Sequence, residues 1–231
     1  MKLAIVSAMH EELSAVLALM PDEQRKTVAG RSFWCGHLHG QEVVAVLSRI
    51  GKVAAATTAT VLAEHFEVRQ IVFTGVAGGL APQVARGDVV VARAFLQHDL
   101  DASPLFPRYE VPLYGTDRFA TDPELTDRLV CAARRALPDA GVHEGLVVSG
   151  DRFVHTGAES LALQAAVPDA LAVEMEGAAI AQVCHDYGIS YAAVRTVSDR
   201  ADDAAHGDFV SFIDQVASRH TAAIVQALLA G

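Results

Sequence analysis

Apolar residues occur in short blocks along the whole chain, and segments with a helical repeat separate these blocks. Residues 2–8 are mostly apolar and predict a buried first strand. Within residues 11–20 the apolar side chains recur at helical spacing, so an amphipathic helix is expected there, and residues 21–23 break it. Strand and helix patterns then alternate along the chain, which is typical of an α/β fold.

The same patterns place the remaining elements. A helix is expected to begin at Thr121 or Asp122, with Pro123 near its first position, and to run to about residue 136. The stretch 95–121 shows no clear pattern and is expected to be irregular; such long segments are usually functional or at an interface. Strands are expected at 26–29, 32–37, 42–48, 70–74, 88–92 and 143–149, and helices at 53–65, 158–166 and 209–228.

The segment 170–202 concentrates charged residues at the ends of two apolar strands that flank a short helix. Glu174 and Glu176 are two residues apart, so they share a face while the chain stays extended, and Arg195 and Asp199 have the same parity. An α/β enzyme presents charged side chains at the carboxyl ends of its strands. Taken alone, the pattern fits a functional site and an ordinary unit with solvated loop acids equally well.

The order of elements predicts a three-layer α/β/α fold with a central, mostly parallel mixed sheet and a hairpin-like region near the start. The sequence contains no repeat, linker or low-complexity tract. A length of 231 residues fits one domain of this class. We therefore expect residues 1–231 to form a single domain.

The composition of the chain limits the kinds of molecule that the protein is expected to bind. A hydrophobic content of 52% and a mean hydropathy of +0.28 are high for a fully exposed monomer, so a buried subunit interface is expected. The net charge of −10 argues against binding to nucleic acid or to anionic membranes. No apolar run reaches the roughly 18 residues of a membrane span. The first residues are typical of a strand rather than a signal peptide, and Cys35, Cys131 and Cys184 are interpreted as buried thiols in a reducing cytoplasm.

The sequence does not support a nucleotide-binding loop or a metal site. The stretch GVAGGLAP lets the backbone come close to a ligand, but it matches neither a dinucleotide fingerprint nor a phosphate loop. His37 and His39 face the same side of a strand end without a further ligand at metal spacing, so a hairpin edge is favoured. His98, Asp99 and Asp101 are more typical of a polar loop than of a metal site. No metal and no other cofactor is expected.

Seven motifs in a fixed order carry a family resemblance: MKLAIVSAMHEE, RIGKVAAA, TGVAGGLAP, GDVVV, VSGDRFV, AVEMEGAAIAQVC and VRTVSD. On these motifs the chain resembles, essentially end to end, the 5′-methylthioadenosine/S-adenosylhomocysteine nucleosidases of the purine nucleoside phosphorylase-like group. The resemblance implies a cytoplasmic, metal-free homodimer. It also implies hydrolysis of the N-glycosidic bond between adenine and a 5′-modified ribose, through a transition state similar to an oxocarbenium ion.

The resemblance also implies roles for individual side chains. Asp199 would protonate adenine N7. Because the ordinary pKa of an aspartate is about 3.9, its site would have to raise that pKa by desolvation or by nearby carboxylates. Glu12 would bind and deprotonate the attacking water, with Arg195 helping to place it. Glu11 is interpreted as an exposed neighbour, and Glu176 would hold the ribose hydroxyls.

Other residues would line the substrate by the same resemblance. Phe153 and Val154 would contact adenine, Met175 the sugar, and Met9 and Ile50 the 5′-substituent together with Phe209. Glu12, Glu174 and Glu176 would supply the negative field around Asp199. The full substrate-binding set is Met9, Ile50, Val76, Ala77, Gly78, Phe153, Val154, Glu174, Met175, Glu176, Ser198 and Phe209.

Two departures from the family pattern bear on activity. Val76 stands where these nucleosidases usually carry a serine, whose hydroxyl helps to hold the water. In the related phosphorylases the same region helps to hold phosphate. Valine can do neither, which weighs against a phosphorylase and leaves the water to Glu12 and Arg195. The segment 95–121 also differs; in the family it reaches the partner subunit's 5′ pocket, so the preferred 5′ group stays open.

Four alternatives remain at this point. The first is a nucleoside phosphorylase of the same fold, and the second is a nucleosidase for another adenine nucleoside, such as aminodeoxyfutalosine. The third is a catalytically silent nucleoside-binding protein, against which the presence of both Glu12 and Asp199 argues. The last is a metallohydrolase using His98, Asp99, Asp202 and Asp203.

Overall fold

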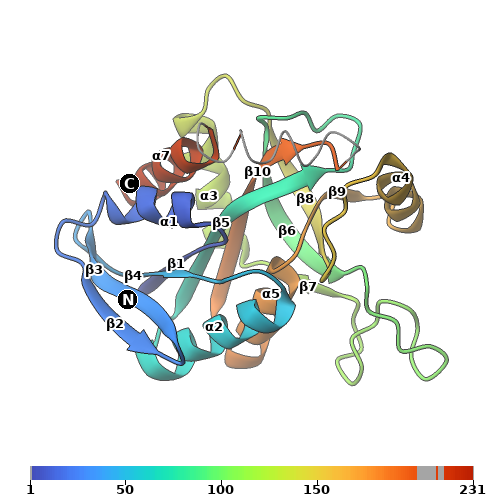
Figure 1. The fold of residues 1–231 in the computed structure, drawn as a ribbon, viewed down its shortest axis with the longest axis horizontal. Helices are drawn as coiled ribbons and strands as arrows, with labels where there is room; N and C mark the ends of the chain where they lie inside the picture. The colour runs from blue at the N-terminus through green and yellow to red at the C-terminus, as the bar shows by residue number, and fades with distance from the viewer. Residues whose placement is uncertain (1, 202–211, 213–215, 231) are drawn as a thin grey trace.

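The computed structural model describes residues 2–201, 212 and 216–230, and its named strands belong to one sheet (Figure 1). The elements in chain order are β1 (Leu3–Ser7), α1 (His10–Leu17), β2 (Gln24–Val28), β3 (Arg31–Leu38), β4 (Gln41–Leu47), α2 (Lys52–Phe66), β5 (Gln70–Gly79), β6 (Val89–Gln97), β7 (Arg118–Ala120), α3 (Pro123–Ala136), β8 (Val142–Ser149), α4 (Gly157–Ala166), β9 (Ala170–Glu174), α5 (Gly177–Tyr187), β10 (Ser190–Asp199) and α7 (Ser218–Leu229).

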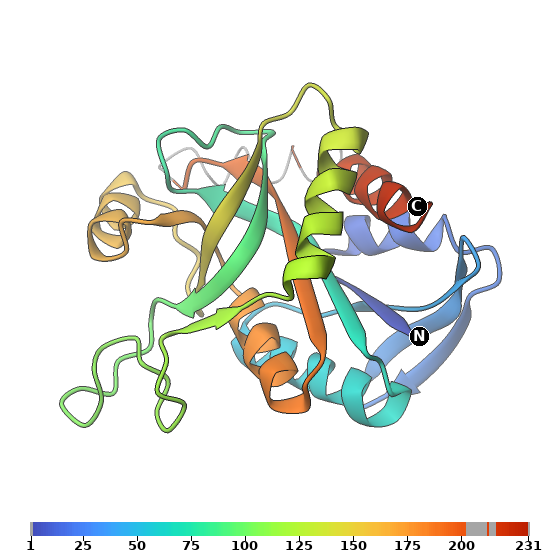
Figure 2. The same cartoon turned by 180° about the vertical axis from the view of Figure 1, so that it is seen from behind.

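The sheet is mixed and partly closes on itself. Its strand order is β10-β6-β8-β9-β5-β1-β4-β3-β2, with β7 beside β6, and β10 also pairs with β5. Strands β5, β10, β6, β8 and β9 therefore form a closed ring, while β1 to β4 extend the sheet outward (Figure 2). Pairing is parallel through β4, β1, β5 and β10 and through β6, β8 and β9. Antiparallel pairs join β10 to β6, β5 to β9, and the hairpins β2–β3–β4.

Helices cover both faces of the sheet, which gives the expected three layers (Figures 1 and 2). Helices α2 and α5 bury Leu62 and Ile180 against one face, in a core that includes Phe33 and Phe73. Helices α1, α3 and α7 bury another set on the opposite face, made of Leu13, Leu129, Val130, Ile224 and Val225. Apolar side chains thus fill the space on either side of the strands, as the α/β class requires.

Several element boundaries differ from the sequence predictions. Strand β5 continues through the glycines to Gly79, because β10 and β9 pair with them. Strand β6 continues to Gln97 and pairs with β7, so only the middle of the stretch 95–121 is irregular. Helix α1 ends at Leu17, and a tighter turn brings the buried Met20 into the core. The predicted helix 209–228 is described only at residue 212 and from residue 216 onward, where it ends one residue later, at Leu229.

The three cysteines are not equally buried. Cys184 is buried, Cys35 is half-buried and Cys131 is exposed. The interpretation of all three as buried thiols is therefore wrong for Cys131, because α3 turns this residue away from the sheet. Within the described ranges, no helix is both long and apolar enough to span a bilayer.

Asp88 ties together the turn before β6 and the loop before β8. One carboxylate oxygen, Oδ2, accepts a hydrogen bond from Ala85 N (2.9 Å) and lies 2.8 Å from His143 Nε2, while Oδ1 accepts from Gly141 N (3.0 Å). Burial by itself would raise the pKa of Asp88, but these three hydrogen bonds outweigh it and lower the pKa. The ionised carboxylate therefore stabilises the folded state.

We expect Asp88→Asn to lower the free energy of unfolding by about 1–3 kcal/mol, because an amide presents only one acceptor oxygen to these donors. Urea unfolding at neutral pH measures the loss, and Asp139→Asn, at an exposed position nearby, is the matched control. The lowered pKa means that the contribution is present above the ordinary pKa and is lost as the pH falls through the folded value. Equal stability of the two variants at neutral pH would contradict this role.

Candidate active site

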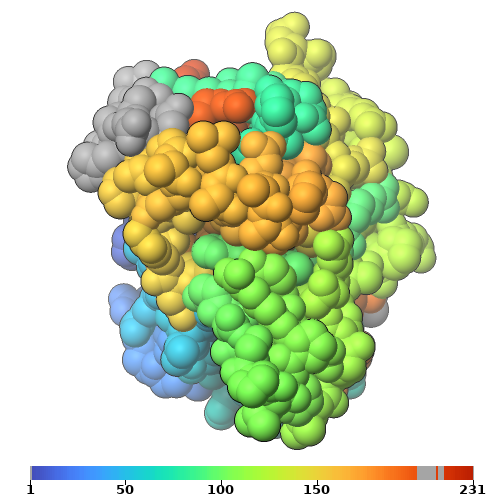
Figure 3. Space-filling view, turned by 90° about the vertical axis from the view of Figure 1, so that its right-hand side faces the viewer, coloured from blue at the N-terminus to red at the C-terminus, as the bar shows by residue number. Residues whose placement is uncertain are grey.

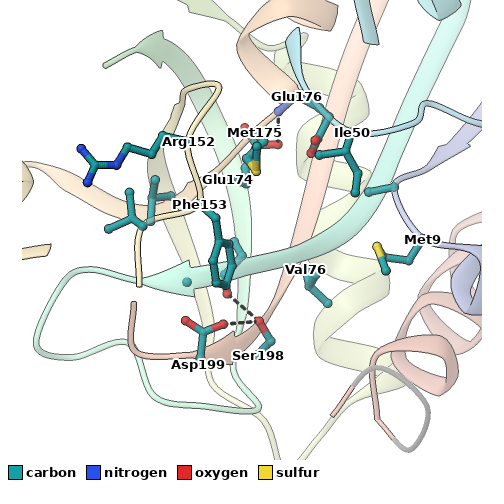
Figure 4. A pocket seen from close by; sticks show the side chains of 15 residues that line it. Met9, Ile50, Val76, Arg152, Phe153, Glu174, Met175, Glu176, Ser198 and Asp199 are labelled. Atoms are coloured by element: carbon teal, nitrogen blue, oxygen red, sulfur yellow. Dashed lines mark hydrogen bonds between the residues drawn. The ribbon is translucent and has the colours of Figure 1, made fainter. Parts of the chain in front are cut away.

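A pocket of about 430 Å³ lies at the carboxyl ends of six strands (Figure 4). Its walls come from β5, β9 and β10 and from the segments that follow β1, β4 and β8. In an α/β protein these strand ends are where ligands bind, and the volume suits a small molecule. The lining residues are Ala8, Met9, Ile50, Val76, Ala77, Gly78, Arg152, Phe153, Val154, Val173, Glu174, Met175, Glu176, Ser198 and Asp199.

The glycines of β5 make room for charged side chains of β10. In the parallel register Gly75 is the partner of Arg195, and Gly78 is the partner of Asp199. A Cβ atom at Gly75 would overlap Arg195 Nη1, and one at Gly78 would lie 2.9 Å from Ala201 Cβ and 3.1 Å from Asp199 Oδ1. The sequence predicts that the backbone approaches a ligand at these glycines. The structure shows that the strand also has to approach its own charged neighbours.

Arg195 is completely buried behind the pocket and does not line it. Its Nη2 donates to Glu174 Oε2, and its Cζ lies 3.7 Å from the centre of the Phe73 ring. Burial by itself would lower the pKa of Arg195, but the surrounding acids outweigh it and raise the pKa. Its Nε and Nη1 atoms are buried with no hydrogen-bond partner among the described residues.

Glu174 accepts hydrogen bonds from four groups, all of them within the protein. These are Arg195 Nη2, Ser149 Oγ, and the backbone N–H groups of Glu176 (3.1 Å) and Gly177 (2.9 Å). The last two open α5, so the carboxylate satisfies donors at the start of that helix. Strand β9 ends at Glu174, so the predicted common face with Glu176 does not arise from an extended chain.

Glu176 is buried at the start of α5 and borders the pocket. Its Oε1 accepts a hydrogen bond of 2.9 Å from Gly51 N, at the start of α2. Burial, followed by the charge of Glu174, raises the pKa of Glu176 to about 7, although Arg195 opposes the rise. At neutral pH this carboxyl group is therefore close to its titration midpoint.

Glu12 lies in the first turn of α1 and is fully buried. Its Oε2 accepts a hydrogen bond of 3.2 Å from Met9 N, and its Oε1 has no partner among the described residues. Burial raises the pKa of Glu12 to about 7, with Arg195 opposing the rise. The interpretation of Glu11 as exposed is wrong, because it is half-buried and its Oε2 is shielded from solvent.

Asp199 is held at the opposite end of the pocket by two local donors. Ser198 Oγ donates to its Oδ2 (2.7 Å), and Ala201 N donates to its Oδ1 (2.7 Å). Figure 4 shows this pair below the ring of Phe153, whereas Met175 and Glu176 lie on the far side of the pocket. Carboxyl groups thus lie on both sides of one cavity, with Asp199 below the Phe153 ring in this view.

The structure places most of the predicted site residues at this pocket. Glu12 and Arg195 are not among the lining residues, and Phe209 lies outside the described residues. Motif matching missed Phe212, which packs on Val76 together with Ala217. It also left out the lining residues Ala8, Arg152 and Val173, although all three lie inside or beside quoted motifs.

The alternative metal ligands do not assemble within the described residues. No group of three or more His, Cys, Asp or Glu side chains is arranged there to hold a metal ion. His37 Nδ1 instead lies 2.7 Å from Asp22 Oδ2, and burial lowers the pKa of His98. Asp202 and Asp203 lie outside the described residues.

Comparison with known proteins gives the same relatives by sequence and by structure. The family model for the phosphorylase superfamily matches residues 2–230. A 5′-methylthioadenosine/S-adenosylhomocysteine nucleosidase of Shewanella loihica is 37% identical over 232 residues, which cover 99% of each chain.

Two solved structures are similar over nearly the whole chain. A nucleosidase of the same name from Neisseria meningitidis, in complex with methylthio-immucillin-A, has a TM-score of 0.93 and 35% identity, covering 98% of this chain and 97% of its own. The futalosine hydrolase of Helicobacter pylori has a TM-score of 0.90 and 31% identity, covering 99% and 97%. The sequence, the pocket and these relatives agree, and the chain belongs to the phosphorylase superfamily and, within it, to the 5′-methylthioadenosine/S-adenosylhomocysteine nucleosidases.

Proposed function

We propose that this protein hydrolyses the N-glycosidic bond of 5′-methylthioadenosine, S-adenosylhomocysteine or both, and releases adenine. The observation that carries the proposal is a single pocket with Asp199 beside Phe153 at one end and Glu176 beside Met175 at the other. The names of the relatives support the same chemistry. The nucleoside has a polar purine at one end and a polar ribose at the other. The pocket offers Asp199 to the purine and Glu176 to the ribose.

Bond cleavage begins at the Asp199 end. The protonated carboxyl group of Asp199 donates its proton to adenine N7, and the electron pair of the glycosidic bond moves into the purine. Phe153 and Val154 hold the base while the ribose gains the character of an oxocarbenium ion. Ser198 and Ala201 keep the carboxyl group of Asp199 in place through their hydrogen bonds.

Glu12 completes the reaction at the other face of the sugar. Its free Oε1 takes a proton from a water molecule, and the resulting hydroxide forms a bond to the anomeric carbon. Arg195 Nη1, also without a partner among the described residues, helps to place that water. Glu176 accepts hydrogen bonds from the ribose hydroxyls, and Glu174 holds Arg195 rather than the substrate.

Val76 favours water over phosphate as the nucleophile. Its side chain packs with Phe212 and Ala217 and borders the pocket, where it offers no hydrogen-bond donor. A phosphate dianion needs donors or cations around it. The acids Glu174 and Glu176 border the same pocket and would repel it.

We also propose a cytoplasmic homodimer formed through the segment 98–117. This segment projects from the body of the molecule (Figure 1) and forms the light-green lobe in the lower part of the space-filling view (Figure 3). Leu105 and Leu113 on it are 84% and 91% exposed, and Val53 on α2 is 79% exposed. Large exposed apolar side chains of this kind mark protein–protein contacts. The three free cysteines are compatible with a reducing compartment.

Incubation with 5′-methylthioadenosine should yield free adenine, and Asp199→Asn should reduce kcat by about 10²–10⁴-fold because it removes the proton donor. Glu12→Gln should be impaired to a similar extent, whereas the neighbouring Glu11→Gln should stay active. Chromatographic measurement of adenine decides this, and full activity of Asp199→Asn would refute the mechanism.

Added phosphate separates the two enzyme classes. A hydrolase releases the free sugar at an unchanged rate, while a phosphorylase releases a ribose 1-phosphate. Phosphate-dependent release would overturn the hydrolytic proposal. S-adenosylhomocysteine and aminodeoxyfutalosine, assayed in parallel, give the substrate preference.

The buried acids predict opposite effects of pH on activity and stability. Glu12 must be ionised to act as a base, and its pKa is about 7, so kcat/KM should rise as the pH rises through about 7. Folding raises this pKa above the ordinary value of 4.5, so its contribution to stability is lost as the pH rises through the folded value. Glu12→Gln should therefore gain stability relative to the unmodified protein between about pH 5 and pH 8 in thermal unfolding. A constant difference would contradict the raised pKa.

Light scattering should give the mass of a dimer, and Leu113→Asp should shift it toward a monomer because a charge at a dry interface is costly. Leu161→Asp, at an exposed leucine on α4, is the matched control and should leave the mass unchanged. A monomeric unmodified protein would refute the proposed assembly.

A further inference from the structure

Outside the pocket, a closed set of hydrogen bonds joins three segments. Two of them, before α2 and after β8, carry lining residues, and the third follows β6. Lys52 Nζ donates to Asp99 Oδ1 (2.6 Å), and Asp99 Oδ2 accepts from Asp151 N (2.8 Å). Asp151 Oδ1 in turn accepts from Lys52 N (2.7 Å). We call these three residues the Lys52–Asp99–Asp151 ring. Each member uses two groups, so no contact can be lost without opening the ring.

The ring connects the two ends of the proposed site. Lys52 follows Gly51, whose N–H holds the Oε1 atom of Glu176, and it lies two residues after Ile50 on the pocket wall. Asp151 lies two residues before Phe153, on the loop that carries the aromatic wall. The distance between the carboxylate and the aromatic ring therefore depends on how these loops are held together.

The start of α2 is suited to bind these carboxylates. The first N–H groups of a helix have no partner inside it, and the helix dipole favours negative charge there. Gly51 is the residue just before α2, and its backbone has a φ of 93°, which favours glycine. A Cβ atom at Gly51 would lie 3.1 Å from Asp151 Oδ1, so a side chain would also crowd this contact.

The ion pair of the ring is partly shielded from solvent. The side chains of Lys52 and Asp99 are 16% and 31% exposed, which makes their attraction stronger than that of a typical surface pair. Gln97 Oε1 also accepts from Lys52 Nζ (3.1 Å), and Gln97 Nε2 donates to Gln182 Oε1 on α5 (3.0 Å). The ring is thus also anchored to the helix that begins beside Glu176.

We propose that Lys52, Asp99 and Asp151 are positioning residues that hold the adenine wall and the ribose carboxylate of the pocket at the separation that one nucleoside requires. The inference rests on the proposed function, since it assigns adenine to Phe153 and ribose to Glu176. None of the three borders the pocket, so they act through the loops they join. Opening the ring weakens the binding of a ligand that spans both ends more than that of a ligand that occupies one end.

The test is Asp99→Asn, whose amide cannot accept from both Lys52 and Asp151. We expect KM for 5′-methylthioadenosine to rise about 10-fold while kcat stays within about 3-fold, as for the loss of one charge-assisted hydrogen bond that acts on binding. Asp101→Asn is the matched control, because this exposed aspartate contacts Ser103 N and Arg108 of its own segment and should change neither constant. A fall in kcat with unchanged KM would overturn the proposal.

A double-mutant cycle tests whether the ring acts as a unit. Lys52→Gln and Asp99→Asn each open the Lys52–Asp99–Asp151 ring. The kcat/KM of the double variant should therefore be no lower than that of the more impaired single variant. Losses that simply multiply would show independent contacts and would overturn the proposal. Urea unfolding of all variants identifies any general loss of folding.

Calorimetry keeps this result separate from the proposed function. Adenine alone contacts one end of the pocket, so its affinity should be the same in Asp99→Asn and in the unmodified protein, while the affinity of a non-hydrolysable adenine nucleoside falls about 10-fold. Equal losses for both ligands would overturn the positioning role. If the unmodified protein released no adenine, the proposed function would fail, but this comparison of affinities would still decide the role of the ring.

Discussion

The structure depends on the buried cation Arg195. A guanidinium group without solvent is costly unless it is paired, and removal of one partner of such a pair typically costs several kcal/mol. Glu174 supplies the negative charge and the face of Phe73 supplies the contact below. These contacts fix three strands and the start of α5 relative to one another, and Gly75 has no side chain so that the guanidinium fits.

The same cation separates the acids around it into different states. Glu174 is bonded to Arg195 and to three further donors. Glu12 and Glu176 accept hydrogen bonds from Met9 N and Gly51 N, respectively, and burial raises the pKa of each to about 7. Glu12 and Glu176 are therefore able to exchange protons at neutral pH, which acid and base chemistry requires.

The local pattern of apolar residues was sufficient to locate the helices that bury one face and the strands that form a continuous apolar run. It located β1, α3 and α5, because burial alone determines which positions are apolar there. It failed at the end of β5, where glycines carry no pattern and pairing with β10 extends the strand. The exposure of Glu11 also depends on how α1 packs, which no local signal records. Motifs brought most of the pocket residues together, but Phe212 and the roles of the β5 glycines required the three-dimensional arrangement.

The start of α2 has a consequence for which adenine compounds the pocket admits. A free helix N-terminus is a common docking point for phosphate. Here the protein's own carboxylates, from Glu176 and Asp151, already accept from the N–H of Gly51, just before α2, and from the N–H of Lys52, its first residue. These two N–H groups are therefore not available to the phosphate of a nucleotide, and the nearby carboxylates would repel it. Under the proposed function, this arrangement would favour thioether nucleosides over the phosphorylated adenine compounds that share their base.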